Sequence, residues 1–374
     1  MSRTVHRRRI ARPAVARLAA LVLTAAAWPA VTAPPAAAAV TFNADPVAVG
    51  LDQPVAFTFT PNRRIFYVEK DTGEVRIYNP VTDSDSLFTT VPGVDGQGER
   101  GTLGIALHPG YPTRPFVYVY ATRNVGGVLQ NQILRFTSNA GVGTNRRTIF
   151  STRASSSPYH NGGRIEFGPD GMLYAIVGEG HTAASAQNLT NPRGKILRMT
   201  SLGRRPADNP IDHSKIFAYG IRNSFGFDFD PVTGDLWETE NGPSCNDEVN
   251  HIPVGGRNYG WGRRQECGGL PAPRDTNNSG PRPRFLPKMW FVNTIGITGM
   301  TFCAGCGLTG SEGDLFFGDV NFGQIRRVAL GAGRNSVAGV GSVVFDTGNV
   351  LSMESGPGGS IYYSDFSGIY RLTN

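Results

Sequence analysis

Three groups of polar residues in this 374-residue chain have types and spacing that suit proton transfer, stabilisation of negative charge or metal binding. His160 stands in the string Tyr-His-Asn-Gly-Gly, and an imidazole that titrates near neutral pH can take a proton from a substrate hydroxyl. Arg222 and Asn223 would place a cation and an amide beside a group that gains negative charge or beside a cofactor carboxylate. The alternatives are a histidine in a solvent-exposed loop and an arginine that pairs with Glu99 or Asp228.

The third group is a stretch rich in oxygen ligands and turn-forming residues, which runs from Glu240 to Glu248 and is followed by Asn-Tyr-Gly-Trp at 258–261. Hard cations such as Ca²⁺ bind carboxylates and main-chain carbonyls of this kind. The stretch lacks the spacing of an EF-hand, so a solvated acidic turn also explains it. We expect structural or solvent-exposed roles for four other histidines, His108, His181, His213 and His251.

The elements that must position these residues are strands. Beyond residue 40 a sustained 3.6-residue apolar pattern is almost absent, whereas short β-branched and aromatic runs alternate with Gly, Pro, Asn and Asp. One three-strand phrase recurs six times, for example as FTFTPNRRIFYVEK with VRIY and as RIEFGPDGMLYAIVG with KILRM. Six such units predict an all-β fold, a six-bladed β-propeller of four-stranded antiparallel blades, more readily than a pair of β-sandwiches. Residues 40–49 would supply the outer strand of the last blade.

In a propeller the first strand of each blade lines the central channel, so the residues just before these strands should meet at one end of it. The positions are occupied by a carboxylate, an imidazole, two guanidinium groups and amides, which together predict an active site. They are Glu99 and Arg100 before the second blade, His160 before the third, Arg222 and Asn223 before the fourth, Gly299 before the fifth and Asn349 before the sixth.

The formal charge of +7 comes mostly from residues 1–39, which hold six Arg and no acid. The remaining chain has 30 basic and 29 acidic residues, which disfavours nucleic-acid binding. A basic start, an apolar stretch too short to span a bilayer and a small-residue tail predict a secretory signal peptide over 1–39, with Sec or Tat export and no stable membrane insertion. We expect 40–374 to form a single propeller domain in a secreted protein.

An oxidising compartment would favour disulfides among the four cysteines. Three pairings are possible, and proximity in sequence favours Cys245 with Cys267 and Cys303 with Cys306. A redox role for the Cys-Ala-Gly-Cys string lacks a surrounding βαβ unit, and a four-cysteine zinc site lacks a second close pair.

Several longer strings resemble the glucose/sorbosone dehydrogenase family, whose soluble six-bladed propellers oxidise sugars with pyrroloquinoline quinone (PQQ) and calcium. The resemblance covers nearly the whole chain after the leader. It is carried by GERGTLGIALHPGY at 98–111, HNGGRIEFGPDGMLYAIVGEG at 160–180, AQNLTNPRGKILRM at 186–199, YGIRNSFGFDFDPVTGDLWETENGP at 219–243, DEVN and NYGW.

The resemblance implies roles for individual residues. His160 matches the base that removes the proton from the sugar C1 hydroxyl while hydride passes to the quinone, and Arg222 would polarise the quinone carbonyl. Cofactor contacts are implied for Glu99, which stands where the glucose enzymes have a glutamine, and for Arg100, His160, Arg222 and Asn223. Calcium contacts are implied for Gly242 and Pro243 through main-chain carbonyls, and for a further calcium site at Glu248 and Tyr259.

The chain also departs from the family pattern. Where the glucose enzymes hold the cofactor carboxylates with a lysine and two arginines, this sequence has Asn321, Asn349 and Leu351, and Ile221 replaces a histidine. Weaker cofactor binding is expected unless other cations substitute, the candidates being Arg100, Lys288, Arg326 and Arg327.

The expected function is therefore an exported PQQ-dependent dehydrogenase that oxidises the C1 hydroxyl of aldoses to lactones. A calcium-dependent hydrolase or lactonase, with His160 activating water, and a propeller that only binds carbohydrate or protein are the alternatives. The substrate sugar would be selected by rim loops at 181–193 and 262–298, whose composition indicates neither the sugar nor the external electron acceptor.

Overall fold

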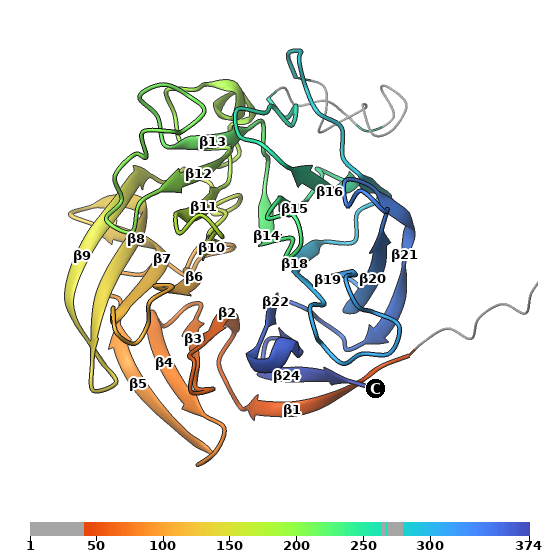
Figure 1. The fold of residues 1–374 in the computed structure, drawn as a ribbon. Helices are drawn as coiled ribbons and strands as arrows, with labels where there is room; N and C mark the ends of the chain where they lie inside the picture. The colour runs from red at the N-terminus through yellow and green to blue at the C-terminus, as the bar shows by residue number, and fades with distance from the viewer. Residues whose placement is uncertain (1–40, 263–266, 268–279) are drawn as a thin grey trace, which may run out of the picture. The chain divides into compact units, whose positions relative to one another are not determined.

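The six-bladed β-propeller expected from the repeats is confirmed. The computed structural model describes residues 41–262, 267 and 280–374. In these residues, six four-stranded antiparallel sheets follow one another around a ring (Figure 1). Two short 3₁₀ turns, η1 (Ala183–Gln187) and η2 (Pro357–Gly359), interrupt the connections.

The strands succeed one another from the ring centre outward. Blades 1 and 2 consist of β2 (Pro54–Phe59), β3 (Ile65–Glu69), β4 (Glu74–Asn79) and β5 (Ser84–Thr90), then β6 (Thr102–Leu107), β7 (Phe116–Val125), β8 (Val128–Asn139) and β9 (Val142–Arg153). Blades 3 and 4 consist of β10 (Ile165–Phe167), β11 (Leu173–Val177), β12 (Lys195–Met199) and β13 (Ile216–Tyr219), then β14 (Ser224–Phe229), β15 (Leu236–Glu240), β16 (Cys245–Ile252) and β17 (Met289–Asn293).

The last two blades differ in how their outer strand is supplied. Blade 5 consists of β18 (Ile297–Phe302), β19 (Leu315–Asp319), β20 (Gln324–Leu330) and β21 (Val337–Asp346). Blade 6 consists of β22 (Ser352–Ser355), β23 (Ile361–Ser364), β24 (Gly368–Thr373) and, from the other end of the chain, β1 (Asn43–Val49). The expected closure by the N-terminal strand is confirmed, because β1 pairs antiparallel with β24 from Asn43 opposite Thr373 to Val49 opposite Gly368.

The core lies between the blades rather than at one centre. All five residues of β11 are buried, because both faces of this strand pack against a neighbouring blade. Leu173, Ala175 and Val177 join a cluster with Tyr118 and Tyr120 of blade 2. The alternate residues of β11 join a cluster with residues of blade 4. A strand with two buried faces requires a continuous apolar run, which is what its sequence, Leu-Tyr-Ala-Ile-Val, provides.

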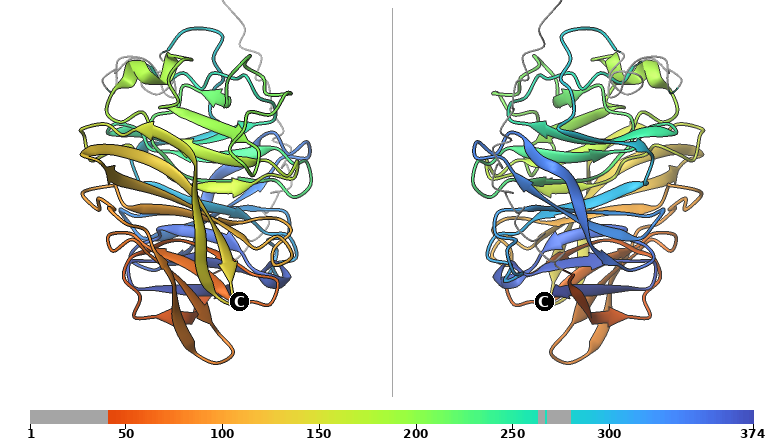
Figure 2. Two further views of the ribbon diagram at one scale, coloured as in Figure 1. Left: turned by 90° about the vertical axis from the view of Figure 1, so that its left-hand side faces the viewer. Right: turned by 90° about the vertical axis from the view of Figure 1, so that its right-hand side faces the viewer.

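The outer surfaces of the blades are more polar. In the long hairpin of β8 and β9, which Figure 2 shows along the outside of blade 2, most of β9 is exposed or half-buried. Its sequence contains two adjacent arginines and several threonines, as expected for an outer strand with a solvated face.

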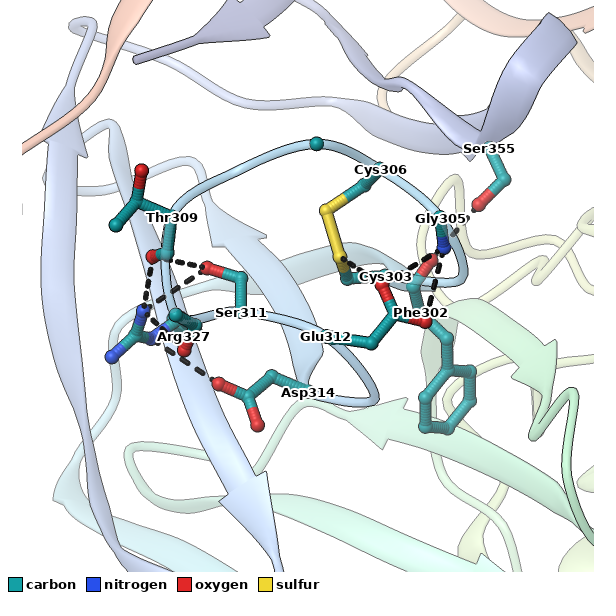
Figure 3. Close-up of a disulfide and its surroundings, with 12 residues drawn as sticks. Phe302, Cys303, Gly305, Cys306, Thr309, Ser311, Glu312, Asp314, Arg327 and Ser355 are labelled. Atoms are coloured by element: carbon teal, nitrogen blue, oxygen red, sulfur yellow. Dashed lines mark hydrogen bonds and ion pairs between the residues drawn. A yellow bond between two sulfur atoms is a disulfide. The ribbon is translucent and has the colours of Figure 1, made fainter.

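Both disulfides expected from sequence proximity are present, Cys245–Cys267 and Cys303–Cys306. Figure 3 shows the second, which closes a tight loop after β18; the Glu312 carboxylate accepts a hydrogen bond from the Gly305 N–H at 3.0 Å. Cys303 is fully buried, and both cysteines belong to the apolar core between blades 5 and 6. This bond is therefore a structural disulfide.

The predicted signal peptide at 1–39 lies outside the described residues and stays a prediction. Among the residues that are described, no helix is long and apolar enough to cross a membrane.

The Cys245–Cys267 bond should contribute to stability mainly by restricting the unfolded chain. It closes a loop with a sequence separation of 22 residues, so a Cys245→Ala/Cys267→Ala variant should lose about 3 kcal/mol of unfolding free energy. Denaturant-induced unfolding would measure the loss, with Ser336→Ala, at an exposed position before β21, as the control. An unchanged unfolding midpoint in the double variant would contradict this expectation.

Candidate active site

The inner ends of the blades enclose a cavity of about 510 Å³ that receives residues from all six blades. Four of the predicted side chains line it together, namely Glu99, His160, Arg222 and Asn223. The expectation that residues before the innermost strands converge is confirmed for these four. Asn349 is not among the lining residues, and Gly299 lies inside β18 rather than before it.

His160 is held by a backbone conformation that few residues adopt. Its φ is 61°, in the left-handed region. Its N–H donates to Glu99 Oε2 at 2.7 Å, and its carbonyl accepts from the Gly180 N–H at 3.0 Å. A Cβ on Gly178 would lie 2.3 Å from the same carbonyl, so the close approach requires glycine. Strain of this kind persists only where neighbouring contacts fix it, as they do here.

The His160 ring is oriented by Glu179, a residue that the sequence analysis did not single out. His160 Nδ1 lies 2.6 Å from Glu179 Oε1, and both side chains are almost fully buried. Burial lowers the pKa of His160, and the Arg222 cation lowers it further, whereas Glu179 and Glu99 raise it. The net effect is a lowered pKa, which keeps the imidazole neutral at neutral pH. Because Nδ1 is bound to Glu179, Nε2 is the ring nitrogen left to accept a proton.

Arg222 and Asn223 stand beside this histidine because the blade 3 and blade 4 loops are tied together. The Glu179 N–H donates to the Arg222 carbonyl at 2.9 Å. Asn223 Nδ2 donates to Glu99 Oε2 at 3.1 Å, so one carboxylate oxygen joins Asn223 to the His160 backbone. The Arg222 guanidinium donates to the Asn241 carbonyl at 2.7 Å and lies over the Trp261 ring, and burial lowers its pKa.

The alternative of an arginine locked in ion pairs is not supported. Among the described residues no carboxylate lies within ion-pair distance of Arg222, and Asp228 instead accepts from Thr301. Ile221, at the position of the family's histidine, is fully buried between blades 3 and 4.

Arg100 has a different position from the one predicted. It does not line the cavity, and its guanidinium donates to the carbonyls of Ser155, Ser156 and Ser157 at 2.8 to 3.1 Å. It therefore supports the loop that leads to His160 and has no direct access to a ligand in the cavity.

The predicted calcium ligands divide into two places. Gly242 lines the cavity, and its N–H donates to Asp247 Oδ1 at 2.8 Å, which fixes the Gly242-Pro243 turn. Asp247 Oδ2 also accepts N–H bonds from residues 295 and 296 at 2.8 Å. Glu248, on β16, and Tyr259, which packs between blades 3 and 4, are both buried and do not line the cavity. The Tyr259 hydroxyl donates to the His251 carbonyl at 2.7 Å, which leaves its main-chain carbonyl as the candidate ligand.

Two further carboxylates, Glu238 and Glu240, accompany Glu248 on facing strands, where Glu240 pairs with Glu248 across the sheet. All three are buried, and burial raises the pKa of Glu238 to about 7 and that of Glu240 well above its usual range. Glu238 Oε2 has no hydrogen-bond partner among the described residues. Within that part of the chain, no three His, Cys, Asp or Glu side chains form a ready metal centre.

The wall formed by blades 5 and 6 is neutral at the positions where the resemblance noted from the sequence implies cations. Its lining residues are Val320, Asn321, Leu351 and Phe366, of which Asn321 and Leu351 were expected there from the resemblance. None of the proposed replacements reaches the cavity lining. Arg327 is bound to Ser311 and Asp314 at the blade edge (Figure 3), Arg326 lies over the Phe291 ring, and Lys288 is also absent from the lining.

The family model described as glucose/sorbosone dehydrogenase matches residues 51–368. This chain belongs to the glucose/sorbosone dehydrogenase family.

Its relatives include sugar dehydrogenases from several bacteria. The chain is 27% identical over 341 residues to aldose sugar dehydrogenase YliI of Escherichia coli, covering 87% of this chain and 90% of that protein. It is 31% identical over 251 residues to quinoprotein glucose dehydrogenase B of Acinetobacter calcoaceticus, covering 59% of this chain and 52% of that protein. The PQQ-bound aldose sugar dehydrogenase of Streptomyces coelicolor superposes with a TM-score of 0.75 at 25% identity, covering 89% of this chain and 98% of that one. An oxidoreductase acting on CH–OH groups is thus supported for this family member.

The contact between Glu179 and His160 leads to a prediction about the pKa of His160 in the protein without cofactor. Glu179→Gln removes a negative charge that raises the pKa of His160, so this pKa should fall further below its ordinary value. An NMR titration of the His160 ring would measure the change. Glu312→Gln, at an exposed position in blade 5, is the matched control. An unchanged or higher His160 pKa in Glu179→Gln would show that Glu179 does not act on the ring.

Proposed function

We propose that this protein is an exported PQQ-dependent dehydrogenase that oxidises the C1 hydroxyl of aldose sugars to lactones. The observation that carries the proposal is the arrangement of His160, with Nδ1 held by buried Glu179, beside Arg222 and Asn223 in one cavity. Membership of the family and the PQQ-bound structural relative support the cofactor assignment.

The residues around His160 fit a quinone. Asn223 Oδ1 is buried and lacks a partner among the described residues, so this side chain has capacity left for a ligand. The Arg222 guanidinium has five N–H donors, of which the described residues accept one. A cavity of about 510 Å³ is in the usual range for cofactor sites. His160, Arg222 and Asn223 would hold the quinone end, and Gly242 and Pro243 would offer carbonyls to its calcium.

Oxidation at C1 removes a proton from the hydroxyl and a hydride from the carbon, and the C–O bond becomes a carbonyl. PQQ, when bound, supplies the acceptor for the hydride and its two electrons. His160 Nε2 takes the hydroxyl proton, because Nδ1 is already engaged with Glu179. The lowered pKa of His160 keeps the base unprotonated near neutral pH, and the Glu179 carboxylate stabilises the imidazolium that forms.

The Arg222 cation would favour negative charge that develops on an oxygen nearby. Its position is fixed by the Asn241 carbonyl and by the Trp261 ring, so little reorganisation is needed when that charge appears. Glu99 acts indirectly in this arrangement, since one of its oxygens holds both the His160 backbone and the Asn223 amide.

A second calcium would lie away from the cavity, near Glu248 and the Tyr259 carbonyl. The support is the gathering of three buried carboxylates, Glu238, Glu240 and Glu248, in that region. A divalent cation would offset the cost of keeping these groups in an apolar interior. Gly242 and Pro243, by contrast, would serve the cofactor's own calcium.

The proposal is tested with purified protein, PQQ and Ca²⁺ by dye-linked oxidation of a panel of aldoses. His160→Ala should lower kcat by about 10² to 10⁴, because general-base assistance is lost, while PQQ absorbance still reports binding. His213→Ala, which changes an exposed loop histidine, is the matched control.

Three results of this assay would contradict the proposal. Full activity of the His160→Ala variant would exclude His160 as the base. Absence of aldose oxidation with bound PQQ would exclude the substrate class. Chelator-sensitive lactone hydrolysis without PQQ would favour the hydrolase alternative.

A further inference from the structure

The cavity has few charges with which to hold an anionic cofactor. Its lining contains three cationic residues, Lys70, Arg164 and Arg222, and two acidic ones, Glu99 and Asp247. PQQ is a tricarboxylate, and carboxylates in a partly buried site require charged hydrogen-bond donors or a metal. Because the wall of blades 5 and 6 is neutral, the anchoring cation must come from elsewhere in the ring.

Arg164 is almost fully buried and is held by two side chains of blade 6. Its guanidinium pairs with Glu354 at 3.2 Å, donates to Ser352 Oγ at 2.7 Å and is 5% exposed. Arg222 lies on blade 4 beside the base, where the reacting end of the quinone would be held. Lys70 also has an acidic partner, Asp71 at 2.5 Å, but it is more exposed than Arg164 and lies on blade 1. It is therefore the lining cation that could serve the opposite end of the cofactor.

Lys70 is built into the cavity rather than extending freely from the surface. Its side chain is 14% exposed, and its ammonium donates to Asp71 and, at 2.8 Å, to the Gly96 carbonyl. An ammonium has three N–H donors, and the described residues accept two of them. The third is available to a ligand.

The backbone around Lys70 is equally constrained. Its carbonyl accepts from the Thr102 N–H at 2.8 Å. Gly101, with φ of 139°, passes so close that an added Cβ would lie 2.8 Å from Lys70 Cγ. Asp71 Oδ2 also accepts from the Gln53 amide at 2.9 Å, so a second polar side chain of the lining is held beside the ammonium.

The position of Lys70 suits an anchor for the end of the cofactor remote from His160. Lys70 follows β3 of blade 1. In the ring of six blades, blade 1 lies opposite blade 4, which Arg222 and Asn223 precede (Figure 1). A ligand whose reactive end lies at blade 4 therefore extends towards blades 1 and 6.

We propose that Lys70 binds a carboxylate of the quinone cofactor and replaces, from blade 1, cations that the family places on blades 5 and 6. The inference rests on the proposed function. It assigns to this chain a cofactor anchor that enters from the opposite side of the ring, next to Gln53.

The test is direct binding of PQQ and of its uncharged trimethyl ester, with saturating Ca²⁺, followed by absorbance and tryptophan fluorescence. Lys70→Met should weaken PQQ binding about ten- to hundredfold, as expected for one charged hydrogen bond, and should change ester binding little. Lys70→Arg should retain most of the preference for PQQ over the ester. Lys215→Met, away from the cavity lining, should bind both ligands as the wild type does.

Two outcomes overturn the assignment while the proposed function stands. One is wild-type affinity of Lys70→Met for PQQ, and the other is an equal loss for PQQ and the ester, which would indicate a general distortion of the cavity. If the wild type binds no PQQ in the presence of Ca²⁺, the proposed function fails and this assignment fails with it.

Discussion

The pairing of β1 with β24 is the constraint on which the site depends. Blade 6 obtains its outer strand from the beginning of the propeller, so the ring closes by ordinary antiparallel hydrogen bonds between sequence-distant ends. Closure fixes the distance between blades 1 and 6 and removes two sheet edges that would otherwise be exposed. It also brings Gln53 and Lys70 of blade 1 to the same cavity as Leu351 and Phe366 of blade 6.

The ring holds a reactive group in a strained position because several blades contribute to it. His160 comes from the entry to blade 3, its backbone is bonded by Glu99 from blade 2, and its ring is bonded by Glu179. Arg100 fixes the preceding loop through three carbonyls. The left-handed backbone of His160, the proposed base, is thus held by contacts with residues of neighbouring segments.

The fold was accessible from sequence because its information is local and repeated. Each blade repeats strand, turn and strand with buried apolar residues, so six copies predict the ring and the rim positions of Glu99, His160, Arg222 and Asn223. Glu179 and Lys70 were missed for a different reason. Each follows an inner strand rather than preceding one, and the importance of each depends on contacts with residues far away in sequence. The one available indication was the position of Glu179 in its repeat, two residues after the end of the Leu-Tyr-Ala-Ile-Val strand.

The distribution of charge explains both the resemblance to the family and the departure from it. One wall carries His160 and Arg222, the groups to which the proposed oxidation assigns roles. Asn321 and Leu351, where the resemblance to the family leads one to expect cations, make the wall of blades 5 and 6 neutral. Three cationic and two acidic side chains line the cavity, which leaves a surplus of one positive charge at their ordinary charges. The proposed quinone tricarboxylate would therefore be balanced if a divalent cation bound with it.

The central claim is that this cavity binds PQQ together with calcium. Calorimetric titration of the wild-type protein with PQQ, in excess Ca²⁺ and again after chelation, tests it most directly. The account predicts saturable binding with Ca²⁺ that is lost with the chelator and restored when Ca²⁺ is returned. The account would be contradicted if no binding occurred at PQQ concentrations on the order of tens of micromolar. It would also be contradicted if PQQ bound equally well after chelation of Ca²⁺.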